Sequence, residues 1–298
     1  MQRRQFLGAT AMAGAALAMA RPGRALAEGG KPDLVAVKNG EPAAMFDRGI
    51  QELGGMKAFV KPGQKVLVKP NIGWAVGPER GGNTDPSLVA RIVEQALAAG
   101  AKEVYVFDHC CDDGRASYRA SGIESAAREA GAKVAPGYME SSYQSVEVPS
   151  GDELFKAKVH ELLLQADVFI NVPVLKHHSS SMLTIGMKNL MGVVWDRGYW
   201  HSHSLMQCIA DMATYRKPDL TVVDAYRVMK RNGPRGVSDA DVVAMRTQLL
   251  STDLVAADAA AAKLFGFEPK DIPYIEKAAR AGLGKMDLGA LDIRRIAL

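Results

Sequence analysis

Short apolar runs of the β type alternate with helical segments along almost the whole chain, and this alternation limits the fold more than any other feature. Five such runs are residues 65–68 (KVLV), 103–107 (EVYVF), 167–170 (DVFI), 220–223 (LTVV) and 247–250 (TQLL). Residues 84–100 predict a strong helix that is capped by Thr84 or Asp85. The alternation predicts an α/β fold with a mostly parallel sheet and helices on both faces. The more polar segment 135–160 predicts a small β-rich excursion from the sheet.

The first 27 residues have the pattern of a twin-arginine export signal. Arg3 and Arg4 form a basic head, an Ala/Gly/Met-rich middle follows, and the segment ends in Ala-Leu-Ala. We expect cleavage after Ala27, contact with the twin-arginine export machinery, and a periplasmic or otherwise exported product. Residues 28–298 are then expected to form a single α/β domain. A membrane anchor is the disfavoured alternative, because the apolar middle is shorter than the ~20 residues that span a bilayer.

Removing the signal changes the charge of the chain. The full sequence carries a net charge of +4, and residues 1–27 contain four arginines and no acidic residue. The mature chain is therefore predicted to be neutral overall. No charge run remains to attract nucleic acid or an anionic membrane surface, so neither is expected as a partner.

The chain has three cysteines, Cys110, Cys111 and Cys208. An odd number is not a disulfide framework, and a bond between the adjacent pair would be strained. Buried thiols are the simpler interpretation. Use of a cysteine in metal binding or redox chemistry is the alternative.

Polar side chains follow the ends of the predicted strands, where open parallel sheets bind their ligands. These residues are Lys69 and Asn71, Asp108 and Cys110, Asn171 and Lys176, Asp224, and Asp253. Because the ends of parallel strands share one edge of a sheet, we expect these groups to converge. Polar loops at strand ends are also common without any site, and this remains the alternative.

Two glycine-containing segments could bind an anion. Residues 77–87 (GPERGGNTDPS) lead through Thr84 into a helix N-terminus, whose free N–H groups favour a carboxylate or phosphate. Residues 231–236 (RNGPRG) combine Gly233 and Gly236 with Arg235. An ordinary surface turn is the alternative for each segment. The chain has no P-loop, dinucleotide-binding fingerprint or serine-hydrolase elbow.

A metal ion is a candidate cofactor, with His178, His203, Asp108 and Cys110 as its candidate ligands. Their spacing matches neither a zinc finger nor the H-E-x-x-H motif. A structural role for each histidine is therefore the alternative.

Several motifs occur together in one order: VLVKPN, TDP, ADVFINVPVLKHH, GMKNLMG, LTVVDAY, NGPRG and STDLVAADAAAAKLFG. Together they resemble the bacterial and archaeal family called domain of unknown function 362, over about residues 34–283. The family has no settled activity. Some members carry ferredoxin-like iron–sulfur segments, which implies a redox setting and a redox partner protein as a candidate contact. This chain lacks a C-x-x-C-x-x-C run, so we expect no iron–sulfur cluster of its own.

The predicted site combines cations, carboxylates and amides around a small anionic ligand. Lys176, Lys188 and Asp224 are the predicted catalytic residues, because a lysine beside a carboxylate can exchange protons. The predicted ligand-binding residues are Lys69, Asn71, Thr84, Asn171, Asn189, Gly233, Arg235, Gly236 and Asp253. One hypothesis is a metal-assisted enzyme of the redox or proton-transfer type. The alternative is a non-catalytic periplasmic binding or accessory protein for an anion, a metal or a redox complex.

Overall fold

The computed structural model describes residues 30–298, so the predicted export signal lies outside the described residues. Residues 31–298 form one compact unit. The strands are β1 (Leu34–Lys38), β2 (Lys65–Pro70), β3 (Glu103–Val106), β4 (Lys133–Val134), β5 (Tyr143–Glu147), β6 (Lys156–His160), β7 (Val168–Val172), β8 (Val174–His178), β9 (Met182–Thr184), β10 (Leu220–Met229), β11 (Val242–Ser251) and β12 (Ile293–Ala297).

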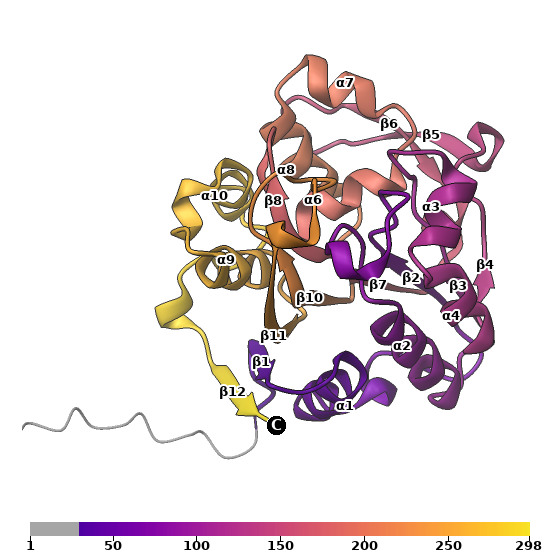
Figure 1. Cartoon of the computed structure of the whole chain (residues 1–298). Coiled ribbons are helices and arrows are strands. Elements are labelled where there is room, and N and C mark those ends of the chain that lie inside the picture. The colour runs from indigo at the N-terminus through magenta and orange to yellow at the C-terminus, as the bar shows by residue number, and fades with distance from the viewer. Residues whose placement is uncertain (1–29) are drawn as a thin grey trace, which may run out of the picture. The chain divides into compact units, whose positions relative to one another are not determined.

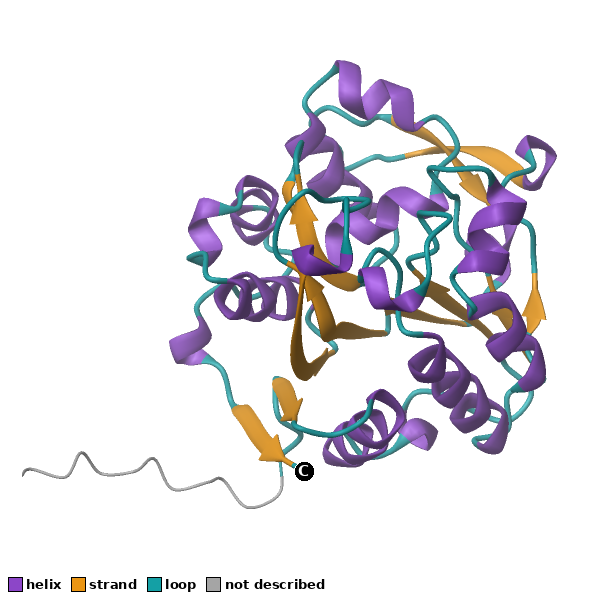
Figure 2. Ribbon diagram, viewed as in Figure 1, coloured by secondary structure: helices purple, strands orange, loops and turns teal. Residues whose placement is uncertain are grey.

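Helices connect these strands (Figures 1 and 2). The α-helices are α1 (Pro42–Glu52), α2 (Pro86–Ala98), α3 (Gly114–Ala120), α4 (Ile123–Glu129), α5 (Glu161–Gln165), α6 (Gly186–Asn189), α7 (Arg197–Ser202), α8 (Leu205–Tyr215), α9 (Leu254–Phe265) and α10 (Pro273–Arg280). The 3₁₀ turns are η1 (Met56–Ala58), η2 (Pro78–Arg80), η3 (Glu140–Ser142), η4 (Leu190–Val193), η5 (Asp239–Asp241), η6 (Pro269–Asp271) and η7 (Leu288–Ala290).

One ten-stranded sheet forms the centre of the molecule, in the order β12-β1-β11-β10-β7-β2-β3-β4, with β8 paired to β10 and β9 paired to β8. The pairs from β10 through β7, β2 and β3 to β4 are parallel. The strand β11 runs antiparallel to both of its neighbours, β1 and β10. The prediction of a mostly parallel sheet is therefore confirmed. Two reversed strands, β11 and the short β9, which runs antiparallel to β8, were not indicated by the sequence pattern.

Two apolar clusters lie on opposite faces of this sheet. Val66 and Val68 of β2 face the cluster that α1, α2 and α4 cover, whereas Leu67 faces the cluster that contains α8, α9 and α10. Alternate side chains of a strand point to opposite faces, so a strand apolar at every position is buried on both. This arrangement confirms the predicted helices on both faces (Figure 1).

The predicted β-rich excursion is a separate antiparallel pair, β5 and β6. The strong helix predicted for residues 84–100 is α2, and its N-cap is Asp85, whose carboxylate accepts a hydrogen bond from Ser87 N at 2.9 Å. The other cap candidate, Thr84, instead links two strands at the edge of the sheet.

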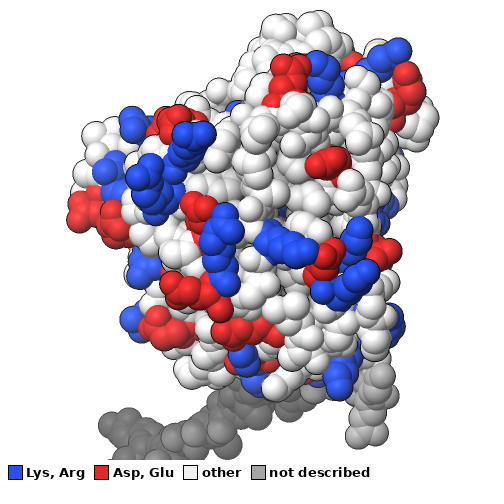
Figure 3. Space-filling model, turned by 90° about the vertical axis from the view of Figure 1, so that its right-hand side faces the viewer, with Lys and Arg blue, Asp and Glu red and all other residues white. Residues whose placement is uncertain are grey.

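None of the helices in residues 30–298 is long and apolar enough to cross a membrane. On the face shown in Figure 3, basic and acidic side chains are interspersed. That surface shows no broad field of one sign, in keeping with the near-neutral charge predicted for the mature chain.

Candidate functional site

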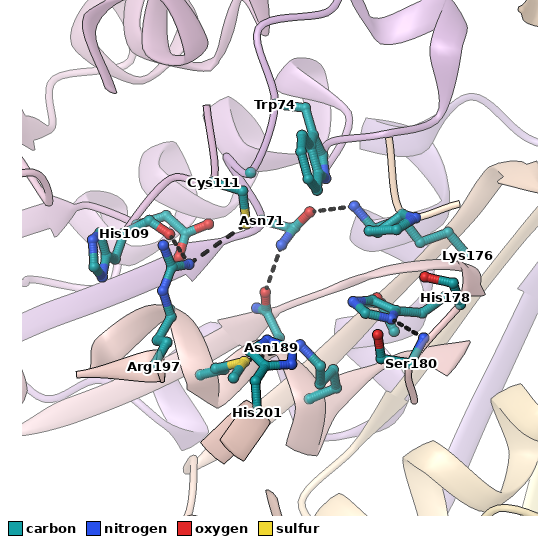
Figure 4. A pocket seen from close by; sticks show the side chains of 18 of the residues that line it. Asn71, Trp74, His109, Cys111, Lys176, His178, Ser180, Asn189, Arg197 and His201 are labelled. Carbon is teal, nitrogen blue, oxygen red and sulfur yellow. Dashed lines mark hydrogen bonds between the residues drawn. The ribbon is translucent and has the colours of Figure 1, made fainter. Parts of the chain in front are cut away.

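A pocket of about 410 Å³ lies at the edge of the sheet where β2, β3 and β7 end (Figure 4). Six segments line it: the loop after β2, the loop after β3, the hairpin β8–β9, the turn α6–η4, α7, and the loop 231–236, which contributes Pro234. The lining residues used below are Asn71, Trp74, Asp108, Cys111, Lys176, His178, Lys188, Asn189, Arg197 and His201.

Three asparagine amides join neighbouring elements beneath the pocket. Asn71 Nδ2 donates to Asn189 Oδ1 at 3.2 Å, and Asn189 Nδ2 donates to Asn171 Oδ1 at 2.9 Å. Asn171 in turn donates to the carbonyl of Gly186 at 3.0 Å, which ties β7 to the start of α6. Because each amide uses both its donor and its acceptor, the network fixes the positions of the backbone segments that carry the pocket's side chains.

The ammonium of Lys69 and the carboxylate of Asp108 form a buried ion pair, with Nζ 2.7 Å from Oδ1 and side chains at most 2% exposed. Lys69 also donates to Asn189 Oδ1 at 3.0 Å, and Asp108 Oδ2 accepts from Ile72 N at 2.6 Å. Burial lowers the pKa of Lys69, and the charge of Asp108 opposes that shift. The carboxylate of Asp108 is therefore already matched by a cation behind the pocket wall.

Lys176 is fully buried and lies at the pocket on β8. Its Nζ donates to Asn71 Oδ1 at 2.9 Å and to the carbonyl of Gly82. Both acceptors are neutral, so no carboxylate balances its charge there. Burial lowers the pKa of Lys176 to about 7.

Lys188 is a second amine without a charged partner. It lies on α6 with 8% of its surface exposed, and its Nζ contacts Met191 Sδ at 3.0 Å. A thioether is a weak acceptor, so the ammonium protons of Lys188 have little to bind within the protein. Burial lowers the pKa of Lys188 to about 8.

Arg197 of α7 forms the wall across from Lys176 (Figure 4). Its guanidinium donates to the carbonyls of His109, at 2.9 Å, and Cys110, and approaches Cys111 Sγ at 3.6 Å. These contacts attach α7 to the loop after β3. They also leave the guanidinium charge at the pocket without a carboxylate partner.

The charges around the pocket do not balance. Among its described lining residues, Lys176, Lys188 and Arg197 stand against a single carboxylate, Asp108, which already pairs with Lys69. A partly enclosed site lined by one sign of charge concentrates ions of the opposite sign. The arrangement therefore favours an anionic ligand.

Four further predicted residues lie near this edge without lining the pocket. Thr84 Oγ1 donates to Val172 O at 2.7 Å and accepts from Asn71 N at 2.8 Å, so it positions Asn71. Arg235 pairs with Asp112 at 3.3 Å. Gly233 and Gly236 belong to the same loop, residues 231–236, of which Pro234 reaches the pocket.

Asp224 and Asp253 lie away from the pocket. Asp224 accepts hydrogen bonds from Asp85 N at 2.7 Å and Tyr226 N at 3.0 Å, so it holds the start of α2, and burial raises its pKa to about 7. Asp253 caps α9 by accepting from Ala256 N at 2.9 Å. Because β11 runs antiparallel, its carboxyl end lies at the opposite edge of the sheet, and the predicted convergence fails for Asp253.

The four residues predicted as metal ligands have separate environments in the structure, and metal binding stays a prediction. Within residues 30–298, no group of three or more His, Cys, Asp or Glu residues is arranged to hold a metal ion. His178 Nδ1 accepts from Ser180 N at 3.1 Å, and burial lowers its pKa to about 2. His203 is exposed and stacks on Tyr199, and Cys110 is buried.

Several lining residues were not among the predicted site residues, and they include Trp74, Cys111, Arg197 and His201. Trp74 follows Asn71 by three positions, so the strand-end rule could have reached it. The adjacent cysteines could be separated only by the structure, which buries Cys110 and exposes Cys111. The contribution of α7 depends on long-range packing.

Residues 66–263 match the family described as Domain of unknown function (DUF362). The chain belongs to this family. The resemblance predicted from its motifs is confirmed, and the matched region contains the lining residues of the pocket.

One similar protein is the thylakoid-associated protein sll1697 of Synechocystis. It is 27% identical over 253 residues, which cover 78% of this chain and 73% of the relative.

Two solved structures show weak similarity. One is the lactate racemase apoprotein from Thermoanaerobacterium thermosaccharolyticum, at 11% identity and a TM-score of 0.43, over 73% of this chain and 54% of that one. The other is a Thermotoga maritima protein, at 12% identity and a TM-score of 0.45, over 81% and 60%. This chain thus spans little more than half the length of either.

Proposed function

We propose that the protein binds a small anionic ligand in the pocket at the strand ends. The observation that carries this proposal is the imbalance of charge around the pocket. Lys176, Lys188 and Arg197 have no carboxylate partner there, and Asp108 is neutralised by Lys69. A buried cation without a partner is unfavourable, and a ligand carboxylate or phosphate would relieve that cost.

We further propose that the protein is an enzyme of the proton-transfer type, with Lys188 as the group that exchanges a proton with the ligand. The pKa values of Lys188, about 8, and Lys176, about 7, both allow proton exchange near neutral pH. The choice of Lys188 rests on its contacts, because within residues 30–298 its Nζ has only the thioether of Met191 as a hydrogen-bond acceptor. Lys176, held between Asn71 and Gly82, would then bind the charge of the ligand.

Thermal-shift measurements with small carboxylates, phosphates and nucleotides test the anion site. A ligand at 100 times its dissociation constant stabilises a protein by about 2.7 kcal/mol. Lys176→Met and Lys188→Met should each remove most of the stabilisation. Lys102→Met is the matched control, because Lys102 is exposed at the opposite, amino end of β3. Equal shifts in all three variants would overturn the proposal.

A non-catalytic binding or accessory protein could use the same pocket, and the candidate redox partner stays a prediction. Turnover of a bound ligand separates the two functions. If Lys188→Met abolishes turnover even at ligand concentrations that saturate it, while Lys176→Met mainly weakens binding, the enzyme is supported. If every ligand that binds is recovered unchanged, the carrier function replaces it.

We also propose that the chain is exported through the twin-arginine route. The support is the pattern of residues 1–27 and the thylakoid association named for the Synechocystis relative. Replacing Arg3 and Arg4 with lysine should retain a reporter fusion inside the cell. Replacing Arg21 and Arg24 in the same way serves as the control. Unchanged export after the first replacement would refute this route.

A further inference from the structure

The loop after β2 is held by hydrogen bonds at successive residues. Gly73 O accepts from Cys111 N at 2.8 Å and from Asp112 N at 3.2 Å. Ala75 N donates to Asp112 Oδ2 at 3.1 Å. Together with the bond from Ile72 N to Asp108, these contacts attach the loop firmly to the segment after β3.

Trp74 stands at the middle of this loop, and the buried side chain of Asn83 fixes its backbone. Asn83 Oδ1 accepts from Trp74 N at 3.1 Å, and Asn83 Nδ2 donates to Trp74 O at 2.9 Å. The same amide also donates to Val76 O at 3.1 Å. The backbone that carries the indole therefore has little freedom to move.

The indole of Trp74 is only partly buried, and Figure 4 shows it above Asn71 and beside Lys176. Within residues 30–298, neither apolar cluster of the core includes Trp74. Gly82 packs at its edge, since a Cβ there would lie 3.7 Å from Trp74 Cδ1. Core packing does not explain why a rigid loop presents a large aromatic ring to the pocket.

The charge of the pocket limits what can cover that ring. An aromatic face attracts cations, yet Lys176, Lys188 and Arg197 make this pocket unfavourable for a cationic ligand. With cations disfavoured, the kind of ligand group that can still stack on the indole face is a second flat π-system. A pocket of about 410 Å³ is within the range used by small-molecule ligands.

We infer that the ligand is a planar, conjugated carboxylate whose ring or π-system stacks on Trp74 while its carboxylate faces the lysines. This inference rests on the proposed anion site and names the class of ligand it takes. A rigid aromatic platform requires no ordering when the ligand binds, which favours affinity through preorganisation.

Calorimetric titration with matched pairs of ligands tests this inference. Benzoate is compared with cyclohexanecarboxylate, and phthalate with cis-cyclohexane-1,2-dicarboxylate. Each pair keeps the charge and approximate size and differs in planarity. The wild type should bind the aromatic member roughly three- to tenfold more tightly, as expected for one aromatic pair. Trp74→Phe should keep the preference and Trp74→Leu should remove it, with circular dichroism confirming that both variants fold.

The possible results separate the two levels of the proposal. If the two members of each pair bind equally well, and if this binding is lost in Lys176→Met, stacking on Trp74 is overturned and the anion site stands. A preference that persists in Trp74→Leu would assign the selectivity to another group and overturn the role of Trp74. If no member of either pair binds the wild type, the stacking inference fails, and the anion site fails with it only if the phosphates and nucleotides of the thermal-shift screen do not bind either.

Discussion

The substitution Asp108→Asn should destabilise the protein strongly, because it leaves the ammonium of Lys69 buried without its counter-charge. The two groups lie 2.7 Å apart, and neither side chain is more than 2% exposed. Asparagine keeps the size of the side chain and an acceptor for Ile72 N. Removing one member of a buried pair costs about 3–5 kcal/mol. For a chain of this length, that loss lowers the melting temperature by roughly 10 °C.

The pH dependence identifies the cause. The folded pKa of Lys69 lies below its usual value because of burial, and Asp108 is what raises it against that effect. Without Asp108 the folded pKa of Lys69 falls further, and the unfolded chain binds more protons than the folded one over a wider range. Stability of the variant should therefore rise with pH, so that its deficit is smaller at pH 9 than at pH 6.5.

Urea unfolding of three proteins at both pH values checks this reasoning. Adding Lys69→Met to Asp108→Asn removes the orphaned charge and should restore most of the lost stability. The expected deficit of the double variant is about 1–2 kcal/mol, from the hydrogen bonds of Lys69 to Pro70 O and Asn189 Oδ1. A single variant within 1 kcal/mol of wild type, or a double variant that is less stable than the single one, would refute the argument.

Three other predictions concern the same pocket. Because the amines of Lys176 and Lys188 have pKa values of about 7 and 8, affinity for benzoate should fall at least about tenfold between pH 6.5 and 9, as measured by calorimetry, and a flat profile would count against them. Cys111 is exposed at this cationic pocket, so the native protein should favour the anionic reagent iodoacetate over the neutral iodoacetamide. The ratio of the two reaction rates should be roughly tenfold higher in the native than in the urea-unfolded protein, as quantified by peptide mass spectrometry. Gly192→Ala should lower the unfolding free energy in urea by about 1–3 kcal/mol, because a Cβ there would lie 2.6 Å from Lys69 Nζ.

The strand-end rule succeeded where its assumption of parallel strands held. β2 and β7 are parallel neighbours that place Lys69 directly beside Asn171, and β3 is the next parallel strand, so Asp108 reaches the same edge. Alternation of strands and helices along the sequence was enough to predict this. The rule failed for Asp253, because strand direction depends on pairing between distant segments, and β11 pairs in the reverse sense.

The segment after β7 shows a second limit of the sequence. Asn171 and Lys176 were predicted to follow the end of a strand, but Asn171 lies within β7. Beyond Pro173 the chain continues as β8, which pairs with β10 and turns back as β9. Lys176 is therefore held on a strand rather than in a loop. Proline removes one backbone donor and interrupts a ladder, yet the chain can resume pairing with another neighbour beyond it.

The three buried lysines are distinguished by what already binds their charge. Lys69 has a carboxylate, Lys176 has two neutral oxygen acceptors, and Lys188 has a thioether. This order runs from a structural cation, through a cation fixed by two oxygen acceptors, to an amine whose protons have only a weak acceptor within the protein. The roles of the three lysines cannot be distinguished from the sequence, because they depend on the groups that each lysine contacts in the fold. An anionic ligand would complete the coordination of the last two without disturbing the first, which is why we place binding at Lys176 and proton transfer at Lys188.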